Sequence, residues 1–287
     1  MELSDARVRL RRAALPYEQS LLEYLLPIVG TDGNYGQAIG SGFLLQLSSG
    51  TVLITAAHVL SELQNCFLRV PSRSGMVVLE GKPHVTREIR DASFDADVGI
   101  CLLDIEKMTD RPSATPLTVA DLDVDDIPSP QTAYGCWGAP REENRVIGGE
   151  FDVRATFYGG LSASDETYDL VGRQPATHFV MNCDRRLMFG ESCQPVQAPG
   201  FDGISGGPLF RLGTFEEIIR GCARPKLIGM MIEGWDRWSA VVSIRVSVIV
   251  TALRQWFPQF ASELPLPSYV EVQMVPIPED DHDKFRT

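Results

Sequence analysis

Residues 203–208, with the sequence Gly-Ile-Ser-Gly-Gly-Pro, constrain this chain more than any other stretch. Glycine permits tight turns in which a Cβ atom would obstruct the backbone. Such a turn can aim the backbone N–H groups of Gly203 and Ser205 at one point beside the serine hydroxyl, as an oxyanion requires. The segment therefore indicates either a nucleophilic serine with its oxyanion hole or a plain glycine-rich turn before a strand that starts at Pro208.

Two earlier segments favour the nucleophile. His58 ends the sequence Thr-Ala-Ala-His, directly after the apolar run 52–54, and so stands just past a predicted strand. Asp97 directly precedes the apolar strand that follows it, whereas Asp95 is an alternative on the same face if the segment is extended. A histidine base needs a carboxylate acceptor for its second ring nitrogen, and the chain order His58, Asp97, Ser205 therefore predicts a catalytic triad.

These motifs resemble those of trypsin-like serine peptidases with the chymotrypsin fold, especially the compact bacterial and HtrA-like protease domains. Residues 40–44 resemble the family's Gly-Ser/Thr-Gly-Phe strand, and residues 55–58 match its histidine motif. Residues 97–100 and 203–208 resemble its aspartate and serine motifs. The resemblance implies that His58 is the general base, that Asp97 orients it, and that Ser205 is the nucleophile.

The resemblance implies an all-β fold of two six-stranded β-barrels of the chymotrypsin type, with N-terminal and C-terminal helices. We expect four parts, namely a helical extension over residues 1–34, the first barrel over 35–120, the second barrel and closing helix over 121–260, and a Pro-rich acidic tail over 261–287. Helical spacing of apolar residues predicts one helix within about residues 17–27 and a closing helix that starts near Val246. Residues 111–130 are predicted to cross between the barrels, and residues 269–275 to add an edge strand.

The resemblance also implies a substrate-binding strand formed by Ile232, Glu233 and Gly234. Segments 199–200 and 239–241 would line the primary side-chain pocket. Pro199 stands where trypsin-branch members have an acidic residue at the pocket floor, so a preference for Lys or Arg is not supported. Glu233 and Asp202 would either face a basic side chain at the rim or be solvated charges.

Activation by cleavage is not expected. Ile204 stands where family members that are activated in this way have an aspartate, which pairs with the new N-terminal ammonium. The sequence Ile28-Val29-Gly30 resembles such an activated N-terminus, but it lies too close to Gly40, and we interpret it as the end of an amphipathic N-terminal segment. We therefore predict that the protein has no zymogen switch of the trypsin type.

Charge and cysteine content indicate the cellular location of the protein and the partners that it does not bind. The chain carries 26 basic and 38 acidic residues, a net charge of −12, which argues against binding of nucleic acids or anionic membranes. The N-terminal region is a poor secretory signal, and no apolar run approaches the roughly 18 residues of a membrane span. The six cysteines are expected to be free thiols, with Cys183 and Cys193 left open as a pair. No zinc spacing is present, so we expect no metal and no cofactor.

These observations predict an intracellular, cytoplasmic serine endopeptidase that cleaves a restricted protein substrate through an acyl-enzyme. Its expected partners are a protein or peptide substrate and a regulatory partner protein. Two alternatives remain open: a catalytically silent peptide-binding module of the same fold, and a serine esterase or amidase, because one constellation can serve several chemistries.

Overall fold

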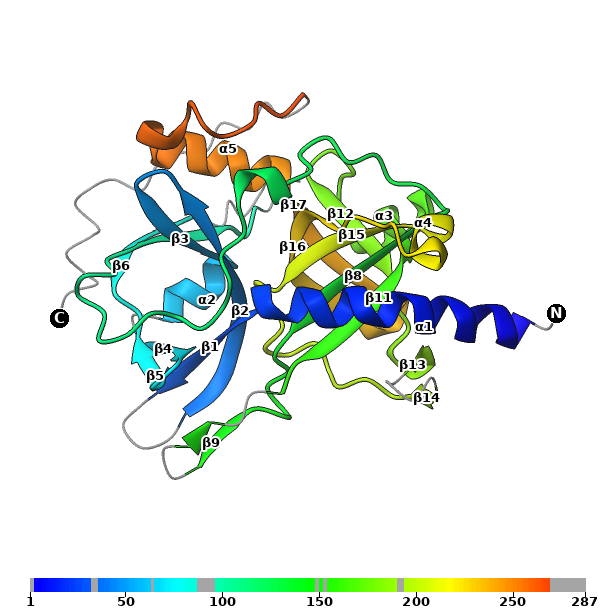
Figure 1. Ribbon diagram of the computed structural model, residues 1–287, viewed down its shortest axis with the longest axis horizontal. Helices are drawn as coiled ribbons and strands as arrows, with labels where there is room; N and C mark the ends of the chain where they lie inside the picture. The colour runs from blue at the N-terminus through cyan, green and yellow to red at the C-terminus, as the bar shows by residue number, and fades with distance from the viewer. Residues whose placement is uncertain are drawn as a thin grey trace.

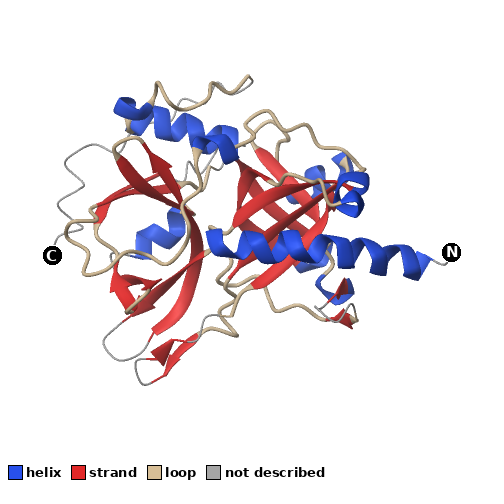
Figure 2. Cartoon of the chain, viewed as in Figure 1, coloured by secondary structure: helices blue, strands red, loops and turns tan. Residues whose placement is uncertain are grey.

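Two β-structures lie side by side in the computed structural model, with two long helices packed across them (Figure 1). The structure describes residues 3–31, 36–62, 65–86, 96–147, 150–151, 154–189 and 194–268. Strands make up most of the regular structure (Figure 2), which confirms the predicted all-β class. The predicted edge strand at 269–275 lies outside the described residues.

The first sheet wraps into a half-barrel with the strand order β5-β4-β1-β2-β3-β7-β6, and the hairpin of β9 and β10 is attached to β2. In the described residues this sheet stays open between β5 and β6, so it is less closed than the predicted first barrel. Its nine strands are β1 (Leu26–Thr31), β2 (Gly36–Leu47), β3 (Gly50–Thr55), β4 (Phe67–Ser72), β5 (Gly75–Val78), β6 (Gly81–Val85), β7 (Gly99–Leu103), β9 (Arg145–Ile147) and β10 (Glu150–Phe151).

The second unit is a closed six-stranded barrel, as predicted, in the order β11-β12-β17-β16-β15-β8. Its strands are β8 (Thr132–Gly138), β11 (Thr156–Ser162), β12 (His178–Asn182), β15 (Pro208–Thr214), β16 (Lys226–Trp235) and β17 (Ala240–Arg245). A small hairpin of β13 (Met188–Phe189) and β14 (Pro195–Val196) lies apart from the barrel. Every strand pair in both units is antiparallel, which suits chain connections that are short enough for hairpins.

Helices cover the outside of this β-framework. The α-helices are α1 (Leu3–Leu21), α2 (Ala57–Ser61), α3 (Asp165–Val171), α4 (Phe215–Arg220) and α5 (Val246–Trp256). Short 3-10 turns are η1 (Leu22–Tyr24), η3 (Val119–Asp121), η4 (Arg185–Leu187), η5 (Asp236–Trp238) and η6 (Pro258–Phe260). Helix α5 begins at Val246, where the closing helix was predicted to start.

The N-terminal segment differs from its prediction. Helix α1 lies along the second barrel (Figure 1), where the indole Nε1 of Trp137 donates to Glu18 O at 2.9 Å. The predicted helix over residues 17–27 overlaps only the end of α1, because residues 26–31 form strand β1 between β2 and β4. Ile28 and Val29 are therefore buried strand residues and not the end of an amphipathic segment. The first sheet thus begins before residue 35.

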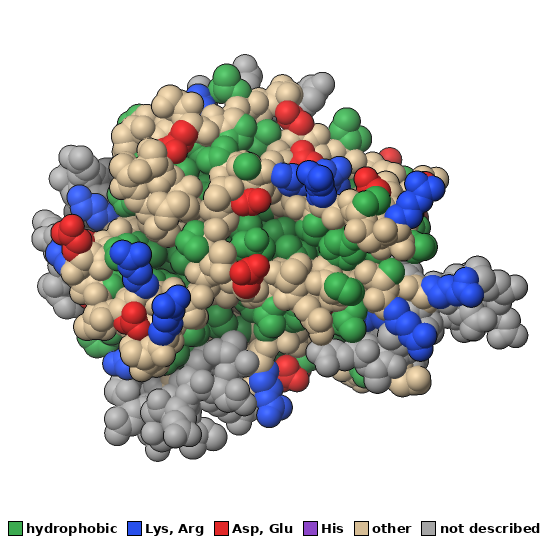
Figure 3. All heavy atoms as spheres, viewed as in Figure 1, with side chains coloured by type: hydrophobic (Ala, Val, Ile, Leu, Met, Phe, Trp, Pro, Cys, Tyr) green, Lys and Arg blue, Asp and Glu red, His purple; other side chains and the backbone are tan. Residues whose placement is uncertain are grey.

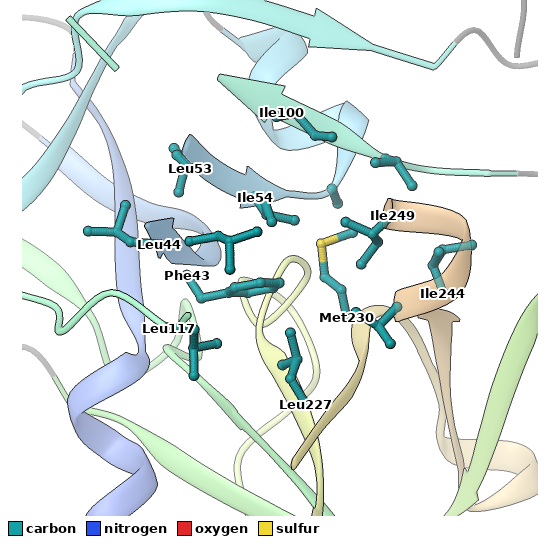
Figure 4. Packing of buried hydrophobic residues seen from close by; sticks show 14 of the residues in the cluster. Phe43, Leu44, Leu53, Ile54, Ile100, Leu117, Leu227, Met230, Ile244 and Ile249 are labelled. Atoms are coloured by element: carbon teal, nitrogen blue, oxygen red, sulfur yellow. The ribbon is translucent and has the colours of Figure 1, made fainter. Parts of the chain in front are cut away.

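One apolar core runs through both units. Figure 4 shows side chains from the first sheet, the second barrel and α5 meeting in a single cluster. The labelled residues are Phe43, Leu44, Leu53, Ile54, Ile100, Leu117, Leu227, Met230, Ile244 and Ile249. Because interiors pack as densely as organic crystals, this shared core holds the two units in a fixed relative position. Any site between the units inherits that rigidity.

The surface is mixed in charge. On the face shown in Figure 3, acidic and basic side chains are scattered, and neither kind forms a single charged patch. Within the described part of the chain, no helix has both the length and the apolar content that a bilayer-spanning segment needs.

Residues 111–130 run between the two units. Leu117 forms a bridge with Leu45 of β2, and Leu122 forms one with Leu227 of β16. Within this segment Asp126 is buried, and neither of its carboxylate oxygens has a hydrogen-bond partner among the described residues. The nearest described cation is Arg211, whose Nε lies 3.7 Å from Oδ1. Burial is the largest cause that raises the pKa of Asp126, to about 6.

Substitution of Asp126 by Asn tests this buried charge. The pKa of Asp126 in the folded protein, about 6, lies above its ordinary value of 3.8, so the folded state is penalised above pH 6 and unpenalised below pH 3.8. We expect Asp126→Asn to raise the free energy of unfolding at pH 7.5 by about 1–3 kcal/mol and to have no such effect at pH 3.5. Denaturant titrations at both pH values measure this, with the exposed Asp169→Asn as control. A loss of stability at pH 7.5, or an equal gain at both pH values, would contradict the prediction.

Candidate active site

His58 and Asp97 meet because their strands are neighbours. Strand β3 leads into α2, which carries His58, and Asp97 lies just before β7, which pairs with β3. The imidazole Nδ1 of His58 lies 2.6 Å from Asp97 Oδ2, and the backbone N–H of His58 donates to Oδ1 at 3.0 Å. A carboxylate only accepts, so Nδ1 carries the proton of this contact, and Nε2 is the ring nitrogen that does not contact Asp97. Asp95, the alternative, lies outside the described residues.

Ser205 comes from the second unit, in the turn before β15. It lines the same cleft as His58, a hollow of about 490 Å³. In the described part of the chain, the Ser205 hydroxyl donates its hydrogen bond to Ile232 O, at 3.1 Å, and not to His58. The structure thus brings His58 and Ser205 to one cleft, whereas Asp97 contacts His58 without lining the cleft, and the serine side chain is turned toward strand β16.

The backbone of the serine turn leaves the N–H groups of Gly203 and Ser205 without an acceptor among the described residues. Asp202 O accepts from Arg141 N at 2.8 Å, and Ile204 O accepts from Gly207 N at 3.0 Å. In a trans peptide the N–H points opposite to the carbonyl of the same unit, so the N–H groups of Gly203 and Ser205 face away from those partners. No described group accepts from either N–H. Both predicted oxyanion-hole donors are therefore available.

Ser41 supports this turn and was not singled out from the sequence. Its hydroxyl donates to Gly203 O at 3.1 Å and accepts from Ala139 N at 3.0 Å. Its backbone N–H donates to Ser205 O at 2.7 Å. Ser41 is fully buried on β2, so the first sheet holds the turn of the second unit that carries Ser205. The signal in the sequence was the small polar residue between two glycines at 40–42.

Ile204 anchors the same turn by apolar packing. Its side chain is almost fully buried in the core cluster of the second barrel and lies against the backbone of Gly138. An aliphatic side chain in this place offers no partner for an N-terminal ammonium. The absence of a trypsin-type switch stays a prediction, and the buried Ile204 agrees with it.

The predicted substrate-binding residues Ile232, Glu233 and Gly234 line the cleft. Glu233 is not an unpaired rim charge, because Arg173 Nη2 donates to its Oε2 at 3.0 Å. Asp202 is exposed and also lines the cleft. Segments 199–200 and 239–241, which were predicted to line the primary side-chain pocket, are not among the residues that line this cleft.

The remaining sequence predictions concern metals and thiols. In the described ranges, no three or more His, Cys, Asp or Glu side chains are grouped so that they could hold a metal ion. Cys101, Cys136 and Cys183 are buried free thiols, and burial raises the pKa of Cys101 and of Cys183 to about 12. Cys193, the other half of the pair left open, lies outside the described residues.

Comparison with known proteins places the fold. No protein-family model and no curated protein matches the chain. Among solved structures, granzyme C (GrC) has a TM-score of 0.51 at 15% identity, over 84% of this chain and 94% of its own. The scabies mite inactivated protease paralogue S-I1 has a TM-score of 0.52 at 13% identity, and the match covers 83% of this chain and 95% of that protein. The apo MamO protease domain from Magnetospirillum magneticum has a TM-score of 0.47 at 15% identity, and the match covers 82% of this chain and 98% of that domain.

The first two of these structures, with TM-scores above 0.5, carry the comparison, and at such identities they show the fold alone. The chain has the chymotrypsin-type double-barrel fold of trypsin-like serine proteases, as its motifs predicted. The HtrA-like branch stays a prediction.

Substitution of Ser41 by Ala tests the support of the turn. The change leaves Ala139 N–H and Gly203 O buried without their hydrogen-bond partner, so we expect the free energy of unfolding to fall by about 1–3 kcal/mol. The rate of labelling of Ser205 by a fluorophosphonate should fall as well, because the oxyanion donors lose their support. Ser61→Ala, which removes one local bond to Ala57 O on α2, is the control. Full stability with unchanged labelling of the Ser41 variant would show that the contact has no such role.

Proposed function

We propose that the protein is a serine endopeptidase that cleaves a restricted protein substrate through His58, Asp97 and Ser205. The observation that carries this proposal is the 2.6 Å contact between Asp97 and His58, because His58 lines the same cleft as Ser205 and Gly203. The backbone N–H groups of Gly203 and Ser205 have no acceptor among the described residues. A base, its orienting carboxylate, a nucleophile and an oxyanion site are the parts that acyl transfer needs.

The reaction begins with rotation of the Ser205 hydroxyl from Ile232 O toward Nε2 of His58. Nε2 takes the hydroxyl proton as Oγ bonds to the substrate carbonyl carbon, and Asp97 stabilises the resulting imidazolium. The N–H groups of Gly203 and Ser205 hold the oxyanion, and loss of one such donor typically costs about 2.7–4 kcal/mol of barrier. The imidazolium then protonates the leaving amine. Water, deprotonated by His58, releases the acyl group and regenerates the Ser205 hydroxyl.

An intracellular, cytoplasmic setting is part of the proposal. The buried free thiols Cys101, Cys136 and Cys183 support it, because long secreted proteins rarely leave several cysteines unpaired. A cytoplasmic protease without a cleavage switch needs another restraint. We propose a regulatory partner protein for that role.

A catalytically silent peptide-binding module is the second candidate. Two observations favour it: the Ser205 hydroxyl is bonded to Ile232 O instead of His58, and a protein named as an inactivated protease paralogue has the same fold. Such a module would use the cleft for capture without turnover.

Labelling with a fluorophosphonate separates the two candidates. We expect the wild-type protein to label and to cleave protein substrates, and Ser205→Ala to do neither while its unfolding midpoint is unchanged. His58→Ala should lower kcat by about 10⁴-fold or more. Ser20→Ala, at an exposed position on α1, is the control and should behave as wild type. An unlabelled wild-type protein would support the silent module, and turnover of small esters without protein cleavage would support an esterase.

Additional residues at the N-terminus test the mode of activation. Because Ile204 is buried among apolar side chains, we expect a variant with such an extension to label at the wild-type rate. The extension itself should therefore be harmless, and restoration of labelling only after its proteolytic removal would reveal a switch that depends on a free N-terminus.

A further inference from the structure

The ring of Phe201 occupies the space beside Ser205. Two segments flank the serine, the loop that carries Phe201 and the strand residues 232–234 on β16, and both line the cleft. The side chain of Phe201 reaches from the first segment to the second. A Cβ atom on Gly234 would lie 2.2 Å from Cγ of Phe201, so the aromatic side chain rests directly on the backbone of Gly234. Glycine is required at 234 for this contact.

Neighbouring groups hold the ring in this position. Its centroid lies 5.4 Å from that of Tyr158, and the guanidinium carbon of Arg185 lies 5.2 Å from it. Arg185 is itself fixed, since it makes two hydrogen bonds to the Asp236 carboxylate, at 2.6 and 2.7 Å, and one to Ala198 O, at 2.8 Å. A ring with defined partners on several sides is part of the wall and not a loose side chain.

The backbone next to Phe201 is fixed as well. Tyr158 Oη donates to Gly200 O at 3.2 Å, and Gly200 N donates to Glu142 Oε1 at 2.6 Å. Displacement of the ring would therefore have to break several contacts at once.

A substrate side chain must enter the same space. When Ser205 Oγ attacks a carbonyl whose oxygen faces the N–H groups of Gly203 and Ser205, the carbonyl carbon lies between the two flanking segments. The Cα of the residue that supplies this carbonyl is only about 1.5 Å away, so its side chain starts between the same segments. The ring of Phe201 already occupies the space between these two segments. The segments behind the ring include the fully buried Val241, which pairs with Gly234.

We propose that Phe201 determines specificity by limiting the residue that supplies the scissile carbonyl to glycine or alanine. This inference rests on the proposed peptidase function and adds its substrate class. Glu233, the carboxylate on the facing strand, is paired with Arg173 and does not select a basic side chain. Once the ring is removed, the space is bounded by Tyr158 and the backbone of Gly234. That surface accepts large apolar side chains.

The test compares cleavage sites in a peptide library for the wild type, Phe201→Ala and Phe201→Leu, with the cut positions read by mass spectrometry. We expect the wild type to cut after Gly and Ala. Phe201→Ala should gain at least about tenfold in kcat/KM after Leu, Met and Phe, because a methylene or more of new pocket changes discrimination by that order. Phe201→Leu keeps the space filled and should retain the wild-type profile. A wild type that cuts after large side chains overturns the proposal, whether or not the variants fold.

Two further measurements distinguish this failure from failure of the proposed function. Fluorophosphonate labelling requires no side chain in the pocket, so labelled Phe201→Ala with an unchanged cleavage profile overturns the role of Phe201 alone. If the wild type does not label, the peptidase function fails, and the restriction on its substrate fails with it. Binding of indole, followed by ligand-observed NMR, then tests without any catalysis whether the ring of Phe201 fills the pocket. An emptied apolar cavity takes up small aromatic molecules. Binding to Phe201→Ala but not to the wild type is expected, and equal behaviour of both proteins would show that the ring does not fill the space.

Discussion

The buried hydrogen bonds of Ser41 join the two halves of the candidate site. Ser41 belongs to β2 of the first sheet, and its hydroxyl and backbone bind Gly203 and Ser205 of the second unit. Thr55 completes the contact by donating to Ser41 O at 2.6 Å. Since His58 follows β3, the neighbour of β2, this set of bonds links the segment that carries His58 to the turn that carries Ser205. Gly206, with φ of +92°, allows the approach, because a Cβ there would lie 1.9 Å from Ser41 O.

Apolar side chains occupy two positions close to Ser205 in the chain, Phe201 and Ile204. Ile204 is anchored in the second core, where activated family members are expected to form an ion pair. The side chain of Phe201, which lines the cleft together with Ser205, rests on the backbone of Gly234. Packing of this kind does not titrate and needs no new terminus, so it forms as soon as the chain folds. The proposed restriction of the substrate follows from this packing, because a filled pocket excludes most side chains.

Local patterns in the sequence predicted the strongest parts of the structure. The apolar strands that precede His58 and follow Asp97 pair in the first sheet, and the glycine-rich segment forms the turn at Ser205. Helix α5 starts where its apolar periodicity indicated. Strand β1 was missed because both of its faces are buried, which removes the alternation that marks a strand. The roles of Ser41 and Phe201 were missed because the glycines that they contact, Gly203 and Gly234, lie more than 30 residues away along the chain.

The sequence by itself determined which residues have the chemistry for acyl transfer and in what order they occur, because short motifs encode strand ends and turns. Only the tertiary structure decided how those residues face one another and how much room lies beside the serine. The reason is physical. Turn and strand preferences act over a few neighbouring residues, whereas the shape of a cleft depends on side chains that meet after the two units have packed on a common core. The packing of the Phe201 ring on the backbone of Gly234 is such a contact, and neither residue alone predicts it in the sequence.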